Sequence, residues 1–413
     1  MDHTLDALVD GYAWLPALRR RQGSDIVETR VLGRRAVALS GPGAAEFFVD
    51  DRDIVREGVV PAPVRATLFG FDSVHGLDGP AHRHRKRLFL AVLPPERVDA
   101  LVAAAGTAWD RRVAAWTADR TVSLHEEAAA ALTDAVCDWA GVPVGDHTAD
   151  DLVAMIDGFA TLGPRHWRAR RARRRQEARL AGLVAEVRVG VHQAAAGTAL
   201  AAVAHHREPD GSLLDQHTAA VELLNVLRPT VATAWLVMFA GHALHRWPRL
   251  RDRLAEDPGY ATAFAHEVRR FYPFAPYVGG RAARELHWHG QRIRPGTLVL
   301  LDIFGQNHDP VLWPAPYEFR PERFAARGPG DFDLVAQGAG DPETGHRCPG
   351  EPAVVRLLAM FARRLATLEY AVPGNDLDIS LRRIPARVAD GMTIRPVPAR
   401  VAAAGVTGSD ATA

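Results

Sequence analysis

The chain has 413 residues, of which 47% are hydrophobic, and its formal net charge at pH 7 is +1. This length can bury a large core, and the near-zero charge argues against a nucleic-acid-binding surface. Two cysteines, Cys137 and Cys348, provide no disulfide framework. The N-terminus resembles no signal peptide, and charged residues interrupt every apolar run before the roughly 20 residues of a membrane span. We therefore expect a cytoplasmic protein that does not enter a membrane.

The hydrophobic pattern predicts a mainly α-helical protein with small β elements. Residues 25–39 alternate around Gly33 as a hairpin does, and Pro295-Gly296 separates two extended runs within 286–303. Further short strands are predicted between 371 and 397. The long helical segments, rich in Ala, Leu and Arg, are 98–118, 121–140, 168–195 and 212–246. The arginine run 168–175 is interpreted as a solvated helix face, because charges at helical spacing normally face water.

One arginine interrupts the most apolar of these helices. Between 221 and 241 the only ionised side chains are Glu222 and Arg228. Six residues place them about 120° apart round a helix, so Glu222 is a poor partner for Arg228. A buried guanidinium without an anion is costly, and the anion that meets it could be a substrate or a distant carboxylate of the fold. Pro229 lacks an N–H and predicts a kink directly after Arg228.

A glycine-rich loop near the C-terminus carries a cysteine, in Gly345-His346-Arg347-Cys348-Pro349-Gly350, before an apolar helical stretch. The helix entrance and the basic neighbours predict a lowered pKa for the Cys348 thiol. Cys137 lies in an apolar segment and is interpreted as a core thiol. A catalytic cysteine would need a histidine and an orienting residue that no local motif supplies. A thiolate ligand of haem iron is therefore the sharper hypothesis for Cys348.

Three ordered motifs carry a family resemblance: Glu267-Val268-Arg269-Arg270, Phe319-Arg320-Pro321-Glu322-Arg323-Phe324 and the cysteine loop. Together they resemble the signatures of cytochrome P450 enzymes. The resemblance implies a buried cluster of Glu267, Arg270 and Arg323 that braces the fold near the haem. One carboxylate between two guanidinium groups satisfies charges that would otherwise be costly inside a protein.

Two departures from the common pattern narrow the resemblance. Oxygen-activating members carry an acid–alcohol pair in the central helix, where this chain has Arg228-Pro229. In the cysteine loop, Asp341 stands where a phenylalanine is common and Thr344 where a glycine is expected. Both departures are similar to the fatty-acid peroxygenase branch, which uses hydrogen peroxide. Further matching segments are Leu68-Phe69-Gly70, His75-Gly76-Leu77-Asp78-Gly79, His82-Arg83-His84-Arg85-Lys86, Gly163-Pro164-Arg165-His166-Trp167 and Phe271-Tyr272-Pro273-Phe274-Ala275-Pro276.

The resemblance implies a cytochrome P450 fold, mainly α with small peripheral β-sheets, and haem b between the long central helix and the helix after the cysteine loop. Cys348 would be the axial ligand of the iron, hydrogen peroxide the oxidant and a fatty acid the substrate, with no redox partner required. It favours a single domain over 1–398. The segment 399–413, rich in Ala, Gly and Thr, is predicted to be a disordered tail.

The resemblance also implies roles for single residues. Arg228, Pro229 and His75 would be catalytic, with the substrate carboxylate held by Arg228 shuttling a proton. The residues lining the substrate pocket would be Arg228, Phe69, Ala232, Ala275 and Tyr277. The residues binding haem would be Cys348, His82, Lys86, Arg56, His346 and Gly350. His82 and Lys86, the only lysine of the chain, share a helix face. An ordinary exposed basic helix is the other interpretation of that face.

His75 bears on the product. Family members with a histidine at this position form terminal alkenes, whereas those with a glutamine mainly hydroxylate. We therefore expect α- and β-hydroxy acids together with a 1-alkene fraction. The other interpretation is that His75 only fixes the loop before the His82 helix.

Two functions of other classes remain open. A dioxygen-dependent monooxygenase served by a redox partner would use Thr230 or Thr233 in place of the usual alcohol. A haem or fatty-acid binding protein would show no turnover.

Overall fold

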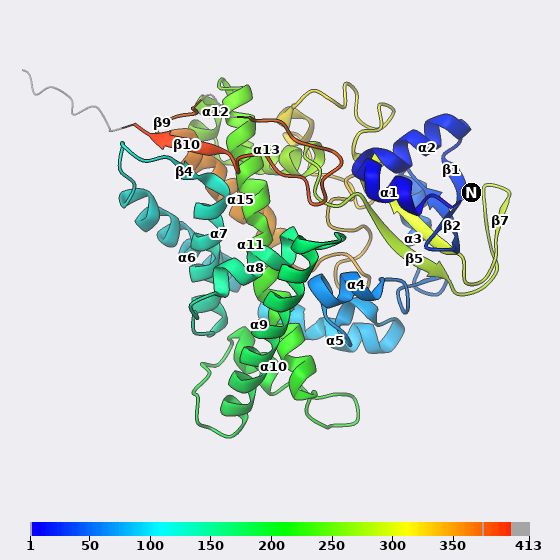
Figure 1. The fold of residues 1–413 in the computed structure, drawn as a ribbon, viewed down its shortest axis with the longest axis horizontal. Helices are drawn as coiled ribbons and strands as arrows, with labels where there is room; N and C mark the ends of the chain where they lie inside the picture. The colour runs from blue at the N-terminus through cyan, green and yellow to red at the C-terminus, as the bar shows by residue number, and fades with distance from the viewer. Residues whose placement is uncertain (1, 374–375, 398–413) are drawn as a thin grey trace, which may run out of the picture.

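The computed structural model describes residues 2–373 and 376–397. Most helices gather on one side of the molecule, and β1, β2, β5 and the N-terminal helices lie on the other (Figure 1). The α-helices are α1 (Thr4–Asp10), α2 (Trp14–Gln22), α3 (Pro42–Phe48), α4 (Ala62–Val64), α5 (Gly79–Val92), α6 (Pro95–Ala114), α7 (Leu124–Ala140), α8 (Thr148–Asp157), α9 (Pro164–Arg188), α10 (Ala199–Ala204), α11 (Gln216–Arg246), α12 (Leu250–Glu256), α13 (Pro258–Phe271), α14 (Ile303–Asn307) and α15 (Glu351–Thr367). The strands are β1 (Ile26–Val31), β2 (Arg34–Leu39), β3 (Ile54–Val55), β4 (Val122–Ser123), β5 (Tyr277–Ala282), β6 (Leu286–Trp288), β7 (Gln291–Ile293), β8 (Leu298–Asp302), β9 (Tyr370–Ala371) and β10 (Thr393–Pro396).

Helix α11 runs through the centre of the helical side (Figure 1) and packs against α7, α9 and α15. Asp215 caps its first turn by accepting the N–H of Thr218 at 3.0 Å. The helix continues through Pro229, so the proline does not end it. By length and composition α11 could cross a membrane, but 83% of its apolar window is buried inside the protein. It is therefore the central core helix.

The largest sheet has the strand order β1-β2-β8-β5-β3. The hairpin predicted at 25–39 is confirmed, since β1 and β2 pair antiparallel. Strand β8 joins β2 in parallel, with Val37 opposite Val299. Side chains of β2 alternate between two apolar clusters, so both faces of this strand are covered. The strand is therefore buried on both faces.

The four long predicted helices correspond to α6, α7, α9 and α11, which confirms the mainly α class. The solvated interpretation of the run 168–175 is wrong for Arg173, whose residue is only 1% exposed. Spacing alone could not show that α9 turns this arginine towards α11. The predicted tail 399–413 lies outside the described residues, and the single domain over 1–398 stays a prediction.

Candidate active site

The cysteine loop ends where α15 begins. The backbone N–H of Cys348 donates to the carbonyl oxygen of Gln337 at 3.0 Å. The Cys348 residue is partly accessible, whereas Cys137 is buried. Burial raises the pKa of Cys348, and the N–H of Gly350 lowers it to a smaller extent. A Cβ at Gly350 would lie 3.8 Å from the sulfur, an ordinary van der Waals contact.

The sequence predicted a lowered pKa for Cys348. In the protein without metal this prediction is wrong, because burial raises the pKa. The basic neighbours are turned away from the sulfur. Arg347 donates to Glu351 at 2.7 Å and to Asp331 at 3.1 Å, and His346 lies 3.5 Å from Asp78. A bound metal deprotonates a coordinating thiol without their help. Cys137 is a fully buried core thiol, as predicted, and burial raises its pKa to about 11.

Helix α5 presses two basic side chains against the cysteine loop. Lys86 is 2% exposed and donates from Nζ to the carbonyl oxygens of Gly345 and Arg347. The ring of His82 stacks on that of His346, with centroids 3.9 Å apart. Burial lowers the pKa of Lys86 to about 8 and that of His82 to about 3. The interpretation of this face as an exposed basic helix is therefore wrong.

Arg56 reaches the same region from β3. Its guanidinium donates to the carbonyl oxygens of Ile54 and Phe48 at 3.3 Å and lies over the Phe48 ring. Gly280 makes room for it, because a Cβ there would lie 2.5 Å from Nη1. Burial lowers the pKa of Arg56 to about 10. In the part of the chain that the structure describes, neither Arg56 nor Lys86 forms an ion pair, so both suit the anionic propionates of a haem.

One face of α11 is less tightly covered than the rest of the helix. Pro229, Ala232 and Leu236 are partly accessible, whereas nearly all their neighbours are buried. These positions are three and four residues apart and share one side of the helix. This side of α11 is therefore the more accessible one, and Arg228 lies at its edge.

Arg228 is 6% exposed and has few partners. Its Nη2 donates weakly to Oδ1 of Asn225 at 3.4 Å, and its Nε has no hydrogen-bond partner. No ion pair reaches it from residues 2–373 or 376–397, so the alternative of a distant carboxylate finds no support there. Burial, followed by the charge of Arg173, lowers the pKa of Arg228 to about 9, while Cys348 is near enough to raise it.

Phe69 and His75 lie beside this guanidinium. Phe69 ends a π-helical turn, and its ring centroid is 5.9 Å from the Arg228 Cζ and 4.4 Å from the His75 ring. Nδ1 of His75 is buried without a hydrogen-bond partner. Burial and then Arg228 hold the pKa of His75 well below its usual value, so the ring is neutral at pH 7. The loop is fixed by the N–H of Val74 rather than by the His75 ring.

The other predicted pocket residues are placed less closely together. Ala232 follows Arg228 by one turn on α11, and Ala275 is partly buried before β5. Tyr277 begins β5 and packs edge-on against Trp14, 5.7 Å away, in the cluster between α2 and the sheet. On α11, Thr230 donates back to the carbonyl oxygen of Val226 at 3.0 Å, whereas the Thr233 hydroxyl is buried without a partner.

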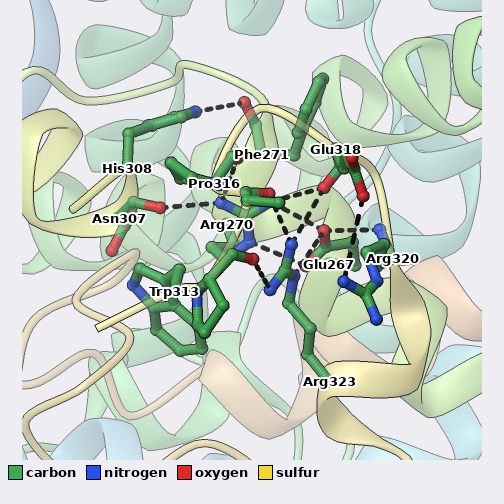
Figure 2. A network of polar contacts seen from close by, with 12 residues as sticks. Glu267, Arg270, Phe271, Asn307, His308, Trp313, Pro316, Glu318, Arg320 and Arg323 are labelled. Atoms are coloured by element: carbon green, nitrogen blue, oxygen red, sulfur yellow. Dashed lines mark hydrogen bonds and ion pairs between the residues drawn. The ribbon is translucent and has the colours of Figure 1, made fainter. Parts of the chain in front are cut away.

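Figure 2 shows Glu267 between Arg270 and Arg323. Arg270 donates to both oxygens of Glu267, at 2.8 and 2.7 Å, and to the carbonyl oxygens of Asn307 and Pro316. Arg323 lies 3.5 Å from Glu267 and donates mainly to the carbonyl oxygens of Pro314 and Ala315. The three predicted residues are thus brought together and join α13 to the segment around 307–323.

Sequence reasoning missed the polar residues that hold the site. Glu222, Asn225 and Arg173 are all buried beside Arg228 or Phe69. One signal was available, because Asn225 precedes Arg228 by three residues and such residues share a helix face. The contribution of Arg173 comes from α9 and required the tertiary structure.

Comparison with known proteins identifies the family that has this fold. A family model described as Cytochrome P450 matches residues 253–383. The fold is similar to that of cytochrome P450SP alpha (CYP152B1), with 42% identity, a TM-score of 0.93 and coverage of 96% of this chain and 98% of that chain. Cytochrome P450EX alpha (CYP152N1), solved with myristic acid, is 35% identical, with a TM-score of 0.90 and coverage of 95% and 96%. Cytochrome P450 OleT is 34% identical, with a TM-score of 0.93 and coverage of 97% and 98%.

A curated relative, the mitochondrial cytochrome P450 4e5 of Drosophila mettleri, is 27% identical over 34% of this chain, and the match spans only 30% of that protein. The full-length structural matches are decisive. The chain belongs to the cytochrome P450 family, in the fatty-acid peroxygenase branch that its motifs indicate. It is an oxidoreductase with the predicted P450 fold, and the family implies haem-thiolate iron.

Proposed function

We propose that the protein uses hydrogen peroxide to hydroxylate fatty acids at the α and β carbons and to decarboxylate part of them to 1-alkenes. The observation that carries this proposal is Arg228, a buried cation on the accessible face of α11 without an anion in the described part of the chain. A fatty-acid carboxylate supplies the missing charge in a bidentate pair. The myristic acid in the structure of P450EX alpha supports this class of substrate.

Both reactions balance without a further reductant. In hydroxylation, a C–H bond becomes C–OH while one peroxide is reduced to water. In decarboxylation, one peroxide and one fatty acid yield one 1-alkene, one carbon dioxide and two waters. The proposed reactions therefore need no redox partner.

Five residues would hold the haem. Cys348 would supply the thiolate to the iron, and Lys86, Arg56 and His82 would bind the propionates, with His346 stacked on His82. Bound in this way, thiolate-ligated haem supplies the peroxide chemistry, because the thiolate favours O–O cleavage.

The substrate carboxylate acts as the base that carries the proton. Arg228 keeps the carboxylate ionised and close to Phe69 and His75, so that a carboxylate oxygen accepts a proton from peroxide and returns it during cleavage. Pro229, which follows Arg228 in α11, has no backbone N–H to donate. A substrate without the acid lacks this base, which accounts for selectivity.

His75 is the second side chain that we expect to act beside the substrate carboxylate. A neutral imidazole with a free Nδ1 can donate or accept one hydrogen bond towards the reacting oxygen. We infer that this favours loss of carbon dioxide over hydroxylation at the β carbon.

Product analysis tests the proposal. Purified holoprotein is given a series of saturated fatty acids with hydrogen peroxide, and hydroxy acids and alkenes are quantified by mass spectrometry. Products with peroxide alone are expected. Turnover only with a reductant and electron donor would show the dioxygen-dependent monooxygenase, and a spectral shift without product would show a binding protein.

A further inference from the structure

Glu222 is a buried carboxylate shared by three elements. Its residue is 0% exposed. Oε1 accepts the N–H of Val74 at 2.8 Å and Nη1 of Arg85 at 3.0 Å, and Oε2 accepts Nδ2 of Asn225 at 3.1 Å. All three partners are donors, so the carboxylate is bound in its ionised form, although burial raises its pKa. One side chain thereby joins the loop of His75, helix α5 and helix α11.

Asn225 passes this connection to the substrate site. Its Nδ2 donates both to Glu222 and to the carbonyl oxygen of Phe69, the latter at 3.0 Å. Its Oδ1 then faces Nη2 of Arg228 at 3.4 Å. Two donors on one side and one acceptor on the other fix the amide in a single orientation.

Arg173, on α9, holds the segment around Phe69 by a second hydrogen bond. Its Nη1 donates to the carbonyl oxygen of Leu68 at 2.5 Å. Gly70 has a φ of +84°, and a Cβ there would lie 2.3 Å from Nη2 of Arg173 and 2.6 Å from Cγ1 of Val221. The segment is thus held at two successive carbonyl groups, one of them by Asn225.

Resting on the proposed function, we propose that Glu222 is a positioning residue that sets His75, Phe69 and Arg228 relative to one another. Its hydrogen bonds go to Val74, Arg85 and Asn225. It acts through Val74, next to His75, and through Asn225, next to both Phe69 and Arg228. Nothing in the sequence motifs assigns this role to it.

Glu222→Gln tests the proposal with almost no change in size. An amide in place of Oε2 would point its N–H groups at the N–H groups of Asn225. Rotating the Asn225 amide relieves this conflict, but it removes the donor to Phe69 and turns N–H groups towards Arg228. A misplacement of this kind is expected to lower turnover about 10–100-fold.

Glu208→Gln is the matched control. Glu208 pairs with the same Arg85 from the solvent side, with its side chain 30% exposed, and contacts neither Val74 nor Asn225 in the bonds described. Glu208→Gln therefore removes one negative charge next to Arg85 but leaves the bonds of Glu222 to Val74 and Asn225 in place. Turnover of this variant should stay within about twofold of the wild type.

Hydrogen–deuterium exchange of residues 68–78 gives a readout independent of activity. Exchange should rise in Glu222→Gln and stay unchanged in Glu208→Gln, with equal haem content in both variants. Unchanged exchange, or raised exchange with wild-type turnover and product ratio, would overturn the positioning role. If Glu222→Gln does not fold, Asn225→Leu is the second test. This variant should raise exchange at 68–70 and lower turnover, while 73–75 stays protected. Exchange and turnover equal to those of the wild type would overturn the positioning role.

Failure of the proposed function has a different signature. A wild type without peroxide products removes that function. The positioning role is then decided by exchange and by the fatty-acid spectral shift, which should weaken in Glu222→Gln and persist in Glu208→Gln. If Glu222→Gln shows neither raised exchange nor a weakened spectral shift, the positioning role is overturned.

Discussion

Burial disfavours the charged form of three residues in the site, and it therefore shifts the pKa values of the bases and of the thiol in opposite directions. It lowers the pKa of Arg228 to about 9, which still leaves a cation at pH 7. It lowers the pKa of His75 so far that the ring is neutral, and it raises the pKa of Cys348. At neutral pH the site therefore offers one fixed positive charge, one neutral imidazole and one thiol ready for a metal.

The two cysteines make the haem assignment testable. Cys348→Ala should abolish the thiolate-type spectrum of the reduced carbonyl complex, because Cys348 is the partly accessible cysteine and lies in the loop before α15. Cys137→Ala should leave the spectrum intact, since Cys137 is fully buried in the core. The measurement is the difference spectrum of the two purified variants. A normal spectrum from Cys348→Ala would refute the assignment.

His75 makes the product ratio testable. His75→Gln should lower the ratio of alkene to hydroxy acid. The Nδ1 of an imidazole can exchange a proton near neutral pH, whereas the amide of glutamine cannot. Peroxide consumption should continue, since Arg228 and Cys348 are unchanged. Gas chromatography of the products gives the ratio. An unchanged ratio, or a wild type that makes no alkene, would exclude His75 as the branching residue.

At the scale of elements, the Glu267 cluster joins α13 to the segment before the cysteine loop. Glu267 and Arg270 have fully buried side chains, and the backbone N–H of Arg320 also donates to Glu267 at 2.8 Å. Removal of one partner leaves an uncompensated charge inside the protein. The cluster therefore fixes the chain direction between α13 and α15.

Glu267→Gln should accordingly lower the free energy of unfolding by about 3–5 kcal/mol and reduce haem retention. Glu322→Gln is the control, because Glu322 pairs with Arg253 at the surface, where such pairs are worth about 0–1 kcal/mol. Denaturant titration of both variants measures the difference. Equal losses would show that the cluster is not a buried brace.

Local pattern predicted the helices, the first hairpin and the three motifs, because periodicity and turn residues act over a few positions. It also singled out Arg228, since one charge in an apolar helix is visible in sequence. It failed where partners come from distant segments. Arg347 adjoins Cys348 in sequence but pairs with Glu351, and Arg173 lies in a basic run yet is buried against Leu68. Such partners follow from tertiary packing, which spacing does not encode.

At the scale of the whole molecule, buried neutral histidines couple stability to pH. Burial lowers the pKa of His125 to about 3 and those of His242 and His308 to about 4. A lowered pKa in the folded state means that the unfolded chain binds more protons below its own pKa, about 6.5. The contribution of these histidines to stability is therefore fully present above pH 6.5 and is lost as the pH drops towards 4.

His125 tests this coupling separately from the haem site. Both its ring nitrogens are buried without partners, and its ring packs edge-on against Trp235 at 4.2 Å. His125→Leu should remove one proton from the transition, which flattens the pH dependence of the unfolding free energy by about 1.4 kcal/mol per pH unit. Urea titrations at pH 5 and 7 measure the slope. Parallel profiles for wild type and variant would contradict the argument.

The central claim is that the substrate carboxylate on Arg228 completes the reaction centre. The most direct measurement is peroxide-dependent turnover of Arg228→Ala beside Arg246→Ala, an exposed arginine at the end of the same helix, each with and without a short carboxylic acid. Arg228→Ala should retain haem and lose turnover, at a cost of about 3–5 kcal/mol, and Arg246→Ala should behave as wild type. In wild type, the short acid should switch on oxidation of a substrate that lacks a carboxylate, and in Arg228→Ala it should not. Fatty-acid turnover by Arg228→Ala, or no response of the wild type to any short acid, would contradict the account.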